Sequence, residues 1–224
     1  MTSWDAFWDD RATMETEFQA TGRSQMDVVG FLHTIVEVAT ALDLSKHDDV
    51  LDIGCGTGLM MLAVRPFVAA VHGIDISQGM IDRARRNLGD DGVDLVSRAT
   101  ITDTGRADRS ADKVIAYSTL QYLSSEDEAR DAIREVGRVL RPGGRALLAA
   151  NPDPDRRAAY ESVLRDGPAT HDVQRAIDLL DDLLWLAPAR ALELAESEGM
   201  HARVLSISPR IRQHFYMYDL LLER

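Results

Sequence analysis

The sequence predicts an α/β protein with a Rossmann-like, seven-stranded, mostly parallel sheet, helices on both faces and an antiparallel last strand. Short apolar runs alternate with amphipathic helical segments between residues 48 and 150, as parallel strands joined by crossover helices do. The glycine-rich stretch VLDIGCGTG, residues 50–58, contains the first such run and ends where open parallel sheets bind ligands. After residue 188, a helical segment and two strand-like segments resume the alternation.

In the first half of the chain, three segments carry apolar residues at helical spacing and three others are short apolar runs. Pro66 ends the second helical segment, and Ser77 precedes the third, where its hydroxyl is placed to cap the helix. The expected helices span residues 24–42, 59–67 and 78–89. The expected strands span residues 48–54, 68–77 and 93–101.

In the second half, the same patterns continue around one interruption. Ser125 and Glu128 have the spacing of a capping box, and an RPGG stretch ends the helix that they begin. Residues 152–188 are helical, acidic and irregular, so we interpret them as an insertion after the fifth strand. The expected helices span residues 124–140 and 188–199. The expected strands span residues 111–120, 145–154, 201–208 and 212–224.

The composition argues against several classes of protein. With 25 basic and 37 acidic residues the formal charge is −12, and such a surface repels a nucleic-acid backbone. The nearest approach to a basic patch is Arg83, Arg85 and Arg86, which we interpret as a solvated helix face. No apolar run is long enough to span a membrane, and the first residues lack the pattern of a secretory signal. We therefore expect neither a nucleic-acid partner nor a membrane partner.

The chain has a single cysteine, Cys55, which excludes an internal disulfide and fits a reducing compartment. We expect a cytoplasmic location. No base is visible near this thiol, so we interpret Cys55 as a small residue of the glycine-rich loop rather than as a nucleophile. The sequence predicts no metal site.

The glycine-rich loop and a distant acid indicate a nucleoside-containing cofactor. Gly54, Gly56 and Gly58 allow a tight turn and a close approach of a ligand to the main chain. Asp75 ends the second strand, 23 residues after Asp52. An acid at about this distance commonly accepts hydrogen bonds from ribose hydroxyls.

The glycine spacing separates this loop from the common phosphate-binding loops. A dinucleotide fingerprint requires a third glycine at the position occupied by Leu59, and a Walker loop requires a Gly-Lys-Ser/Thr sequence that is missing. No additional basic residue lies nearby to hold a diphosphate. The loop therefore predicts a cofactor without phosphates, with a nicotinamide-dependent oxidoreductase as the alternative.

Three motifs in order resemble those of class I S-adenosylmethionine-dependent methyltransferases. VLDIGCGTG resembles their first motif, GIDIS the second, and EVGRVLRPGGRALLA the segment leading into the fifth strand. The resemblance covers residues 48–150, and the strand-rich C-terminus resembles the closing hairpin of the family. It implies S-adenosyl-L-methionine as cofactor and S-adenosyl-L-homocysteine as product.

The resemblance also implies roles for individual residues. The methionine part would lie against Asp52 and the loop glycines, the ribose against Asp75, and the adenine against Ile76 and Met80, with Tyr117 facing the sulfonium. The family often has Gly-Asp-Ala after the third strand, with the Asp contacting the adenine, whereas this chain has Ala99, Thr100 and Ile101. The resemblance therefore implies that Thr100, in preference to Asp103, contacts the adenine. Arg23 is either a surface residue or a clamp on the cofactor carboxylate. The expected cofactor-binding residues are Arg23, Asp52, Gly54, Cys55, Gly56, Asp75, Ile76, Met80, Thr100, Ile101 and Tyr117.

No catalytic residue stands out from the sequence. His33, His171, His214 and Tyr122 are candidates to face the substrate, although a lone histidine is more often structural. Because no acid–base pair is visible, transfer to an oxygen and transfer to a nitrogen both stay open.

We expect one domain over residues 1–224, functioning as a small-molecule methyltransferase. Its parts are an N-terminal helical lid (1–45), a cofactor-binding core (46–151), a helical insertion or lid (152–188), and a C-terminal helix and hairpin (189–224). A cluster of aromatic residues near the N-terminus would anchor the first lid. The acceptor would be a sugar or another natural-product intermediate, and the protein a monomer or a homodimer. A second alternative is a non-catalytic partner protein that binds the same cofactor.

Overall fold

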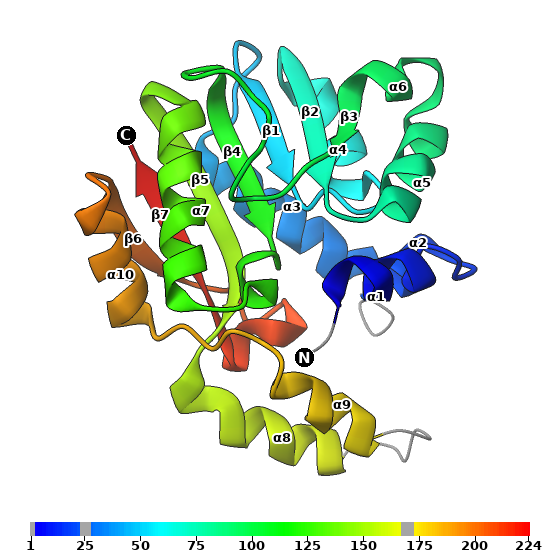
Figure 1. Cartoon of the computed structure of the whole chain (residues 1–224), viewed down its shortest axis with the longest axis vertical. Coiled ribbons are helices and arrows are strands. Elements are labelled where there is room, and N and C mark those ends of the chain that lie inside the picture. The colour runs from blue at the N-terminus through cyan, green and yellow to red at the C-terminus, as the bar shows by residue number, and fades with distance from the viewer. Residues whose placement is uncertain (1–2, 23–27, 167–172) are drawn as a thin grey trace.

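The computed structural model of the chain describes residues 3–22, 28–166 and 173–224. Within them, seven strands form one sheet in the order β3-β2-β1-β4-β5-β7-β6, with helices on both faces (Figure 1). β7 pairs antiparallel with β5 and β6, and all other neighbouring strands pair parallel, which confirms the predicted fold class. The strands are β1 (Asp49–Ile53), β2 (Ala70–Asp75), β3 (Val96–Arg98), β4 (Ala111–Tyr117), β5 (Leu140–Pro152), β6 (His201–Ser206) and β7 (Met217–Glu223).

The helices follow the predicted alternation closely, with short 3-10 turns between them. The α-helices are α1 (Trp4–Arg11), α2 (Glu17–Ala20), α3 (Val28–Leu42), α4 (Leu59–Val64), α5 (Gln78–Leu88), α6 (Gly92–Leu95), α7 (Glu126–Val139), α8 (Arg157–Asp166), α9 (Val173–Leu180) and α10 (Pro188–Ser197). The 3-10 turns are η1 (Arg65–Phe67), η2 (Gly89–Asp91), η3 (Leu120–Tyr122), η4 (Pro154–Arg156) and η5 (Arg212–Phe215). No helix among the described residues is long and apolar enough to cross a membrane.

Six expected strands are shorter than predicted, and the third and the last lose the most residues. The third expected strand, 93–101, is reduced to β3, because its first residues form α6 against α5. A Cβ at Gly92 would lie 2.3 Å from the carbonyl oxygen of Arg85, so α6 begins in close contact with α5 and the chain becomes extended only after it. The last expected strand, 212–224, begins at Met217 because η5 precedes it.

Both predicted helix caps are present. The Ser77 hydroxyl accepts a hydrogen bond from the Met80 amide at 3.0 Å, and the Ser125 hydroxyl accepts one from the Glu128 amide at 3.2 Å. The Glu128 carboxylate accepts from the Ser124 amide at 2.7 Å, one residue before the position of a capping box. The caps place the first turns of α5 and α7 firmly at the carboxyl edge of the sheet.

The sheet separates two apolar cores because successive strand residues point to opposite faces. On β5, Ala146 and Leu148 pack with α7 and α10, whereas Leu147 and Ala149 pack with α3, α4 and α5. Both faces of the central strands are therefore buried, as in other parallel sheets. This rigid layer holds the strand ends that carry the site.

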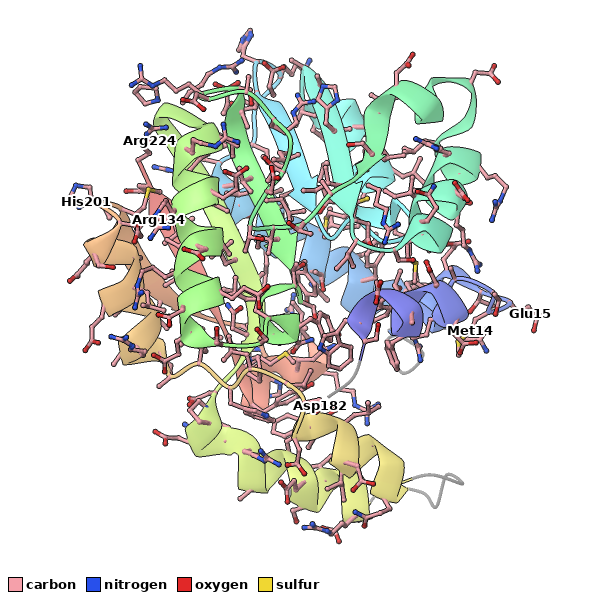
Figure 2. All side chains as sticks on the ribbon, viewed as in Figure 1. Met14, Glu15, Arg134, Asp182, His201 and Arg224 are labelled. Atoms are coloured by element: carbon pink, nitrogen blue, oxygen red, sulfur yellow. The ribbon has the colours of Figure 1, made fainter. Side chains whose placement is uncertain are left out.

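The interpretation of Arg83, Arg85 and Arg86 as a solvated face is wrong for Arg83, which is only 9% exposed. Its guanidinium bonds the Glu17 carboxylate at 2.8 Å and donates to the carbonyl oxygens of Ala12 and Met14. Figure 2 shows Met14 at the turn beside α1 and α2, which this arginine joins to α5. Its partners lie about 70 residues away in sequence, so helical spacing alone could not reveal them.

Candidate functional site

A cavity of about 630 Å³ opens at the carboxyl ends of β1, β2 and β4. Its lining comes from these strand ends, from α1 of the N-terminal segment, from η3, and from the insertion and η5. A volume of this size is typical of small-molecule sites. The position is the one at which open parallel sheets bind ligands, between β1 and its neighbours on either side.

The glycine-rich loop forms the floor of the cavity. The amides of Gly54 and Cys55 both donate to the carbonyl oxygen of Ile74, at 2.8 and 3.0 Å, which fixes the loop against β2. Gly54 has φ +72°, and a Cβ there would lie 2.5 Å from Oγ1 of Thr119. Gly56 has φ +55°. Both glycines are therefore required by the backbone, and Gly54 also by the close approach of Thr119.

Asp75 connects the loop to the end of β2. Its side chain lines the cavity, is 8% exposed, and accepts hydrogen bonds from the amides of Gly56 and Ser77, both at 2.9 Å. Burial raises the pKa of this carboxyl, while the two amide donors oppose that rise. Asp75 thus shapes the loop as well as presenting an acceptor group to a ligand.

The structure brings together the predicted residues that it describes around one cavity. These residues are Asp52, Gly54, Cys55, Gly56, Asp75, Ile76, Met80, Thr100, Ile101, Tyr117 and Tyr122. Arg23 and His171 lie outside the described residues. Of the described histidines none lines the cavity, and this includes the candidates His33 and His214. Nδ1 of His214 lies 2.9 Å from the carbonyl oxygen of Ile211, within its own turn.

Two local contacts bear on residues with alternative interpretations. The Thr100 hydroxyl accepts a hydrogen bond from the Asp103 amide at 3.0 Å, and Thr100 lines the cavity whereas Asp103 does not. Burial raises the pKa of the Cys55 thiol well above its usual value, and Asp52 and Asp75 raise it further. The thiol therefore stays protonated, as expected of a packing residue and not of a nucleophile.

An aromatic cluster from α1 and η3 forms one wall of the cavity. The ring of Tyr122 lies 4.7 Å from that of Trp4 and 5.3 Å from that of Trp8, and Phe7 packs edge-on against both tryptophans. All four rings line the cavity. The aromatic enrichment of the N-terminal segment was the sequence signal for this wall. Its partner Tyr122 was predicted only as a lone candidate.

The same helix is attached to the cofactor side of the cavity. Oδ1 of Asp9 accepts hydrogen bonds from the Ser77 hydroxyl at 2.5 Å and from the Gly79 amide at 2.9 Å, at the start of α5. A Cβ at Gly79 would lie 2.9 Å from Cβ of Ala12, so the helices touch here. α1 therefore bridges the Asp75 side of the cavity and the η3 side.

Sequence reasoning named none of the residues of the wall that the insertion and the segment around η5 form. Its residues are spread over separate segments without a common period, so no local pattern marks them. They are Pro152, Tyr160, Ala176, Leu179, Leu180, Leu183, Trp185, Gln213, Tyr216 and Met217. Tyr160 and Tyr216 stack at 3.9 Å with their planes 5° apart. Among the described residues, no group of three or more histidine, cysteine or acidic side chains is placed to hold a metal ion.

The lining fits a nucleoside cofactor without phosphates. Arg11 is the one lysine or arginine in the described lining, and its guanidinium donates to the carbonyl oxygens of Gln19 and Ala20. The loop presents main-chain groups and leaves room for a ligand, and Asp75 presents a carboxylate where the loop meets β2. Fold and site together are those of a Rossmann-like protein whose cavity at the first strand suits a phosphate-free nucleoside cofactor.

Comparison with known proteins finds methyltransferases. Residues 51–148 match the model of the methyltransferase domain family. The methyltransferase GfsG of Streptomyces halstedii is 28% identical over 188 residues, covering 81% of this chain and 64% of that protein. The O-methyltransferase resE of Aspergillus sclerotiorum is 27% identical over 200 residues, covering 85% and 69%. The chain thus spans about two thirds of the length of these two relatives. It spans about a third of the length of one further relative and about half of another.

Solved structures show the same fold. A Haloferax volcanii methyltransferase, solved in complex with the Trm112 methyltransferase activator, has a TM-score of 0.71 at 20% identity, with 96% of each chain covered. The geranyl diphosphate C-methyltransferase of Streptomyces coelicolor, solved with S-adenosyl-L-homocysteine, has a TM-score of 0.62 at 17% identity, covering 87% of this chain and 80% of that one. Residues 51–148 thus match a methyltransferase domain family, and the chain has the fold of these two solved methyltransferases.

Proposed function

We propose that this chain transfers a methyl group from S-adenosyl-L-methionine to an oxygen or nitrogen atom of a small molecule by in-line displacement. One observation carries the proposal: a single cavity joins the glycine-rich loop and Asp75 to an aromatic wall. The cofactor and an acceptor placed at these two ends would meet inside it. Holding the reacting atoms in line in this way contributes about 7–11 kcal/mol to lowering a barrier.

Ten residues are proposed to hold the cofactor. Asp52, the loop glycines and Cys55 face the methionine part, Asp75 the ribose, and Ile76, Met80, Thr100 and Ile101 the adenine, with Tyr117 near the sulfonium. Their shared position along the cavity lining supports this assignment. When bound, the cofactor supplies an electrophilic methyl group on a positively charged sulfur.

The proposed domain organisation makes residues 1–45 and 152–188 two lids over the core. Both segments supply side chains to the cavity, and α1 spans its two walls. Closed lids would exclude water and orient the acceptor. The contact of Tyr122 with Trp4 and Trp8 gives that tyrosine a place in the acceptor wall.

The chain's contribution to the proton step is small in this proposal. The hydroxyl of Tyr216, a buried tyrosine of the lining, has its pKa raised well above the usual value by burial and by Tyr160, so it stays protonated. No described histidine lines the cavity, so the proposal gives neither Tyr216 nor a described histidine the role of base. An acceptor that ionises by itself needs no such base.

A labelled-methyl screen tests this function. Purified chain is incubated with methyl-labelled S-adenosyl-L-methionine and panels of phenols, alcohols, sugars, amines and carboxylates. Transfer to at least one oxygen or nitrogen acceptor supports the proposal. Tight binding of S-adenosyl-L-homocysteine without transfer to any panel member would instead favour a non-catalytic partner protein.

A further inference from the structure

We infer that the acceptor is an uncharged, largely apolar ring compound, bound between the α1 wall and the insertion. This inference rests on the proposed function and names the substrate class of the same site. It is carried by the chemistry of the lining at the end of the cavity away from the glycine-rich loop.

The insertion side of the lining carries no charge. The ten lining residues from Pro152 to Met217 include no acidic, lysine, arginine or histidine side chain among the described residues. This is unusual in a chain with 28% charged residues. A charged acceptor on this side would lose its hydration without gaining a charged partner, which disfavours its binding. Sugar phosphates, amino acids and nucleotides are therefore poor fits.

Two polar groups of this side are bonded within the protein. The indole Nε1 of Trp185 donates to the carbonyl oxygen of Leu180 at 2.9 Å, and the Leu184 amide donates to that of Gln121 at 2.8 Å. One buried acceptor of the lining stays open to a ligand, because Oε1 of Gln213 has no hydrogen-bond partner among the described residues. Arg157 lies over the Trp185 ring at 5.5 Å, but its charge is compensated by Glu161. What remains for a ligand at Trp185 is chiefly ring surface.

Aromatic rings line the cavity from two sides, which favours a flat acceptor. Trp4, Trp8 and Tyr122 stand on the α1 side, whereas Tyr160 and Tyr216 form a stacked pair on the other. Contacts between aromatic rings stabilise a complex beyond the burial of their area. A sugar would need a hydrogen-bond partner for each buried hydroxyl, whereas the described part of this side offers one open side-chain acceptor, Oε1 of Gln213, among mainly aliphatic and aromatic residues.

The tryptophans give a direct readout of binding. The chain has three tryptophans, and Trp4, Trp8 and Trp185 all line the cavity. The protein is saturated with S-adenosyl-L-homocysteine and titrated with neutral 2-naphthol, anionic 2-naphthalenesulfonate and glucose while tryptophan fluorescence is recorded. We expect saturable quenching by 2-naphthol, with at least tenfold weaker binding of the other two. Equal or tighter binding of the sulfonate or of glucose would overturn the inference.

A pair of variants locates the site. Leu183→Asp places a charge in the lining and should weaken 2-naphthol binding at least tenfold. Val163→Asp, in the same insertion but outside the lining and 41% exposed, should change it less than twofold. Equal effects of the two variants would contradict the inference. If Leu183→Asp does not fold, Leu183→Asn replaces it, with at least threefold weaker binding expected and no change contradicting it.

Calorimetry with S-adenosyl-L-homocysteine on the same samples separates the two proposals. If this ligand binds and 2-naphthol does not, the substrate class is wrong while the proposed function stands. If the homocysteine ligand itself does not bind, the proposed function falls. Both aspartate variants should keep its affinity within twofold of the unmodified chain.

Discussion

At the scale of single residues, Gly54 is the position where backbone and ligand requirements meet. Gly54→Ala is strained for two reasons, because the backbone has φ +72° and because the new Cβ would lie 2.5 Å from Oγ1 of Thr119. Oγ1 of Thr119 donates to the carbonyl oxygen of Ile53 at 3.1 Å, so it is held in place. We predict that this variant weakens binding of S-adenosyl-L-homocysteine more than tenfold, as measured by calorimetry.

Gly105 supplies the matched control. It has φ +65°, but a Cβ there would meet nothing within 4 Å. Gly105→Ala should therefore cost about 1–2 kcal/mol of backbone strain and leave the affinity within twofold. Similar losses of affinity in both variants would mean that left-handed alanine weakens binding through backbone strain alone, and that the approach of Thr119 is irrelevant.

Asp219 on β7 gives a pH-dependent prediction. Burial raises the pKa of its carboxyl to about 6, and Oδ1 accepts from the amide of Ala150, whose φ is +58°. Because the folded-state value exceeds the unfolded value near 3.9, the folded state gains a proton first as pH falls. Stability relative to Asp219→Asn should rise by about 2 kcal/mol between pH 7 and pH 4 and be lost again as pH rises through 6.

The measurement for Asp219 is urea unfolding of both proteins across this pH range. The difference between their free energies of unfolding cancels the titration of all other groups that the two share. An exposed control, Asp127→Asn, should run parallel to the unmodified chain. A constant difference between Asp219→Asn and the unmodified chain would show that Asp219 titrates normally in the folded protein.

At the scale of elements, α1 and α2 depend on a few polar contacts, because α1 has no buried residue. Arg83 supplies several of these contacts from α5, including the ion pair with Glu17 at 2.8 Å. Arg83→Ala leaves the partly buried Glu17 carboxylate without this partner, which should cost about 2–3 kcal/mol. We predict a lower Tm and faster proteolytic cleavage between residues 3 and 22.

Arg86 is the control for this prediction because it lies on the same helix and is exposed. Arg86→Ala should change the free energy of unfolding by less than about 0.5 kcal/mol. If both arginine variants behave alike, the N-terminal segment is held by its aromatic contacts with Tyr122 instead. Proteolysis separates the cases, because loosening confined to the N-terminal segment exposes that segment before the core unfolds.

At the scale of the whole molecule, the sequence predicted the cofactor side of the cavity far better than the acceptor side. Asp52, Gly54 and Gly56 lie within five residues of one another, and Asp75 follows in the next strand, so one strand-turn-helix unit and its neighbour carry the pattern. Parallel pairing of β1 and β2 then brings their ends together without further information. Such sites are encoded locally.

The acceptor side and the attachment of α1 could not be predicted in this way. Tyr122 and Tyr160 come from separate turns and helices and meet the cavity only through tertiary packing. Arg83 was misinterpreted for the same reason, since its partner Glu17 lies 66 residues away. The lengths of β3 and β7 were overestimated because α6 and η5 include residues that the expected strands contained.

The most direct test of the account is a paired titration of the purified chain with S-adenosyl-L-homocysteine and NADH. The glycine spacing, Asp75 and the lack of a phosphate-binding cation at the described loop predict one saturable site for S-adenosyl-L-homocysteine by calorimetry. They predict no NADH fluorescence change under the same conditions. Binding of NADH, with no heat and no thermal shift from S-adenosyl-L-homocysteine, would contradict the central claim.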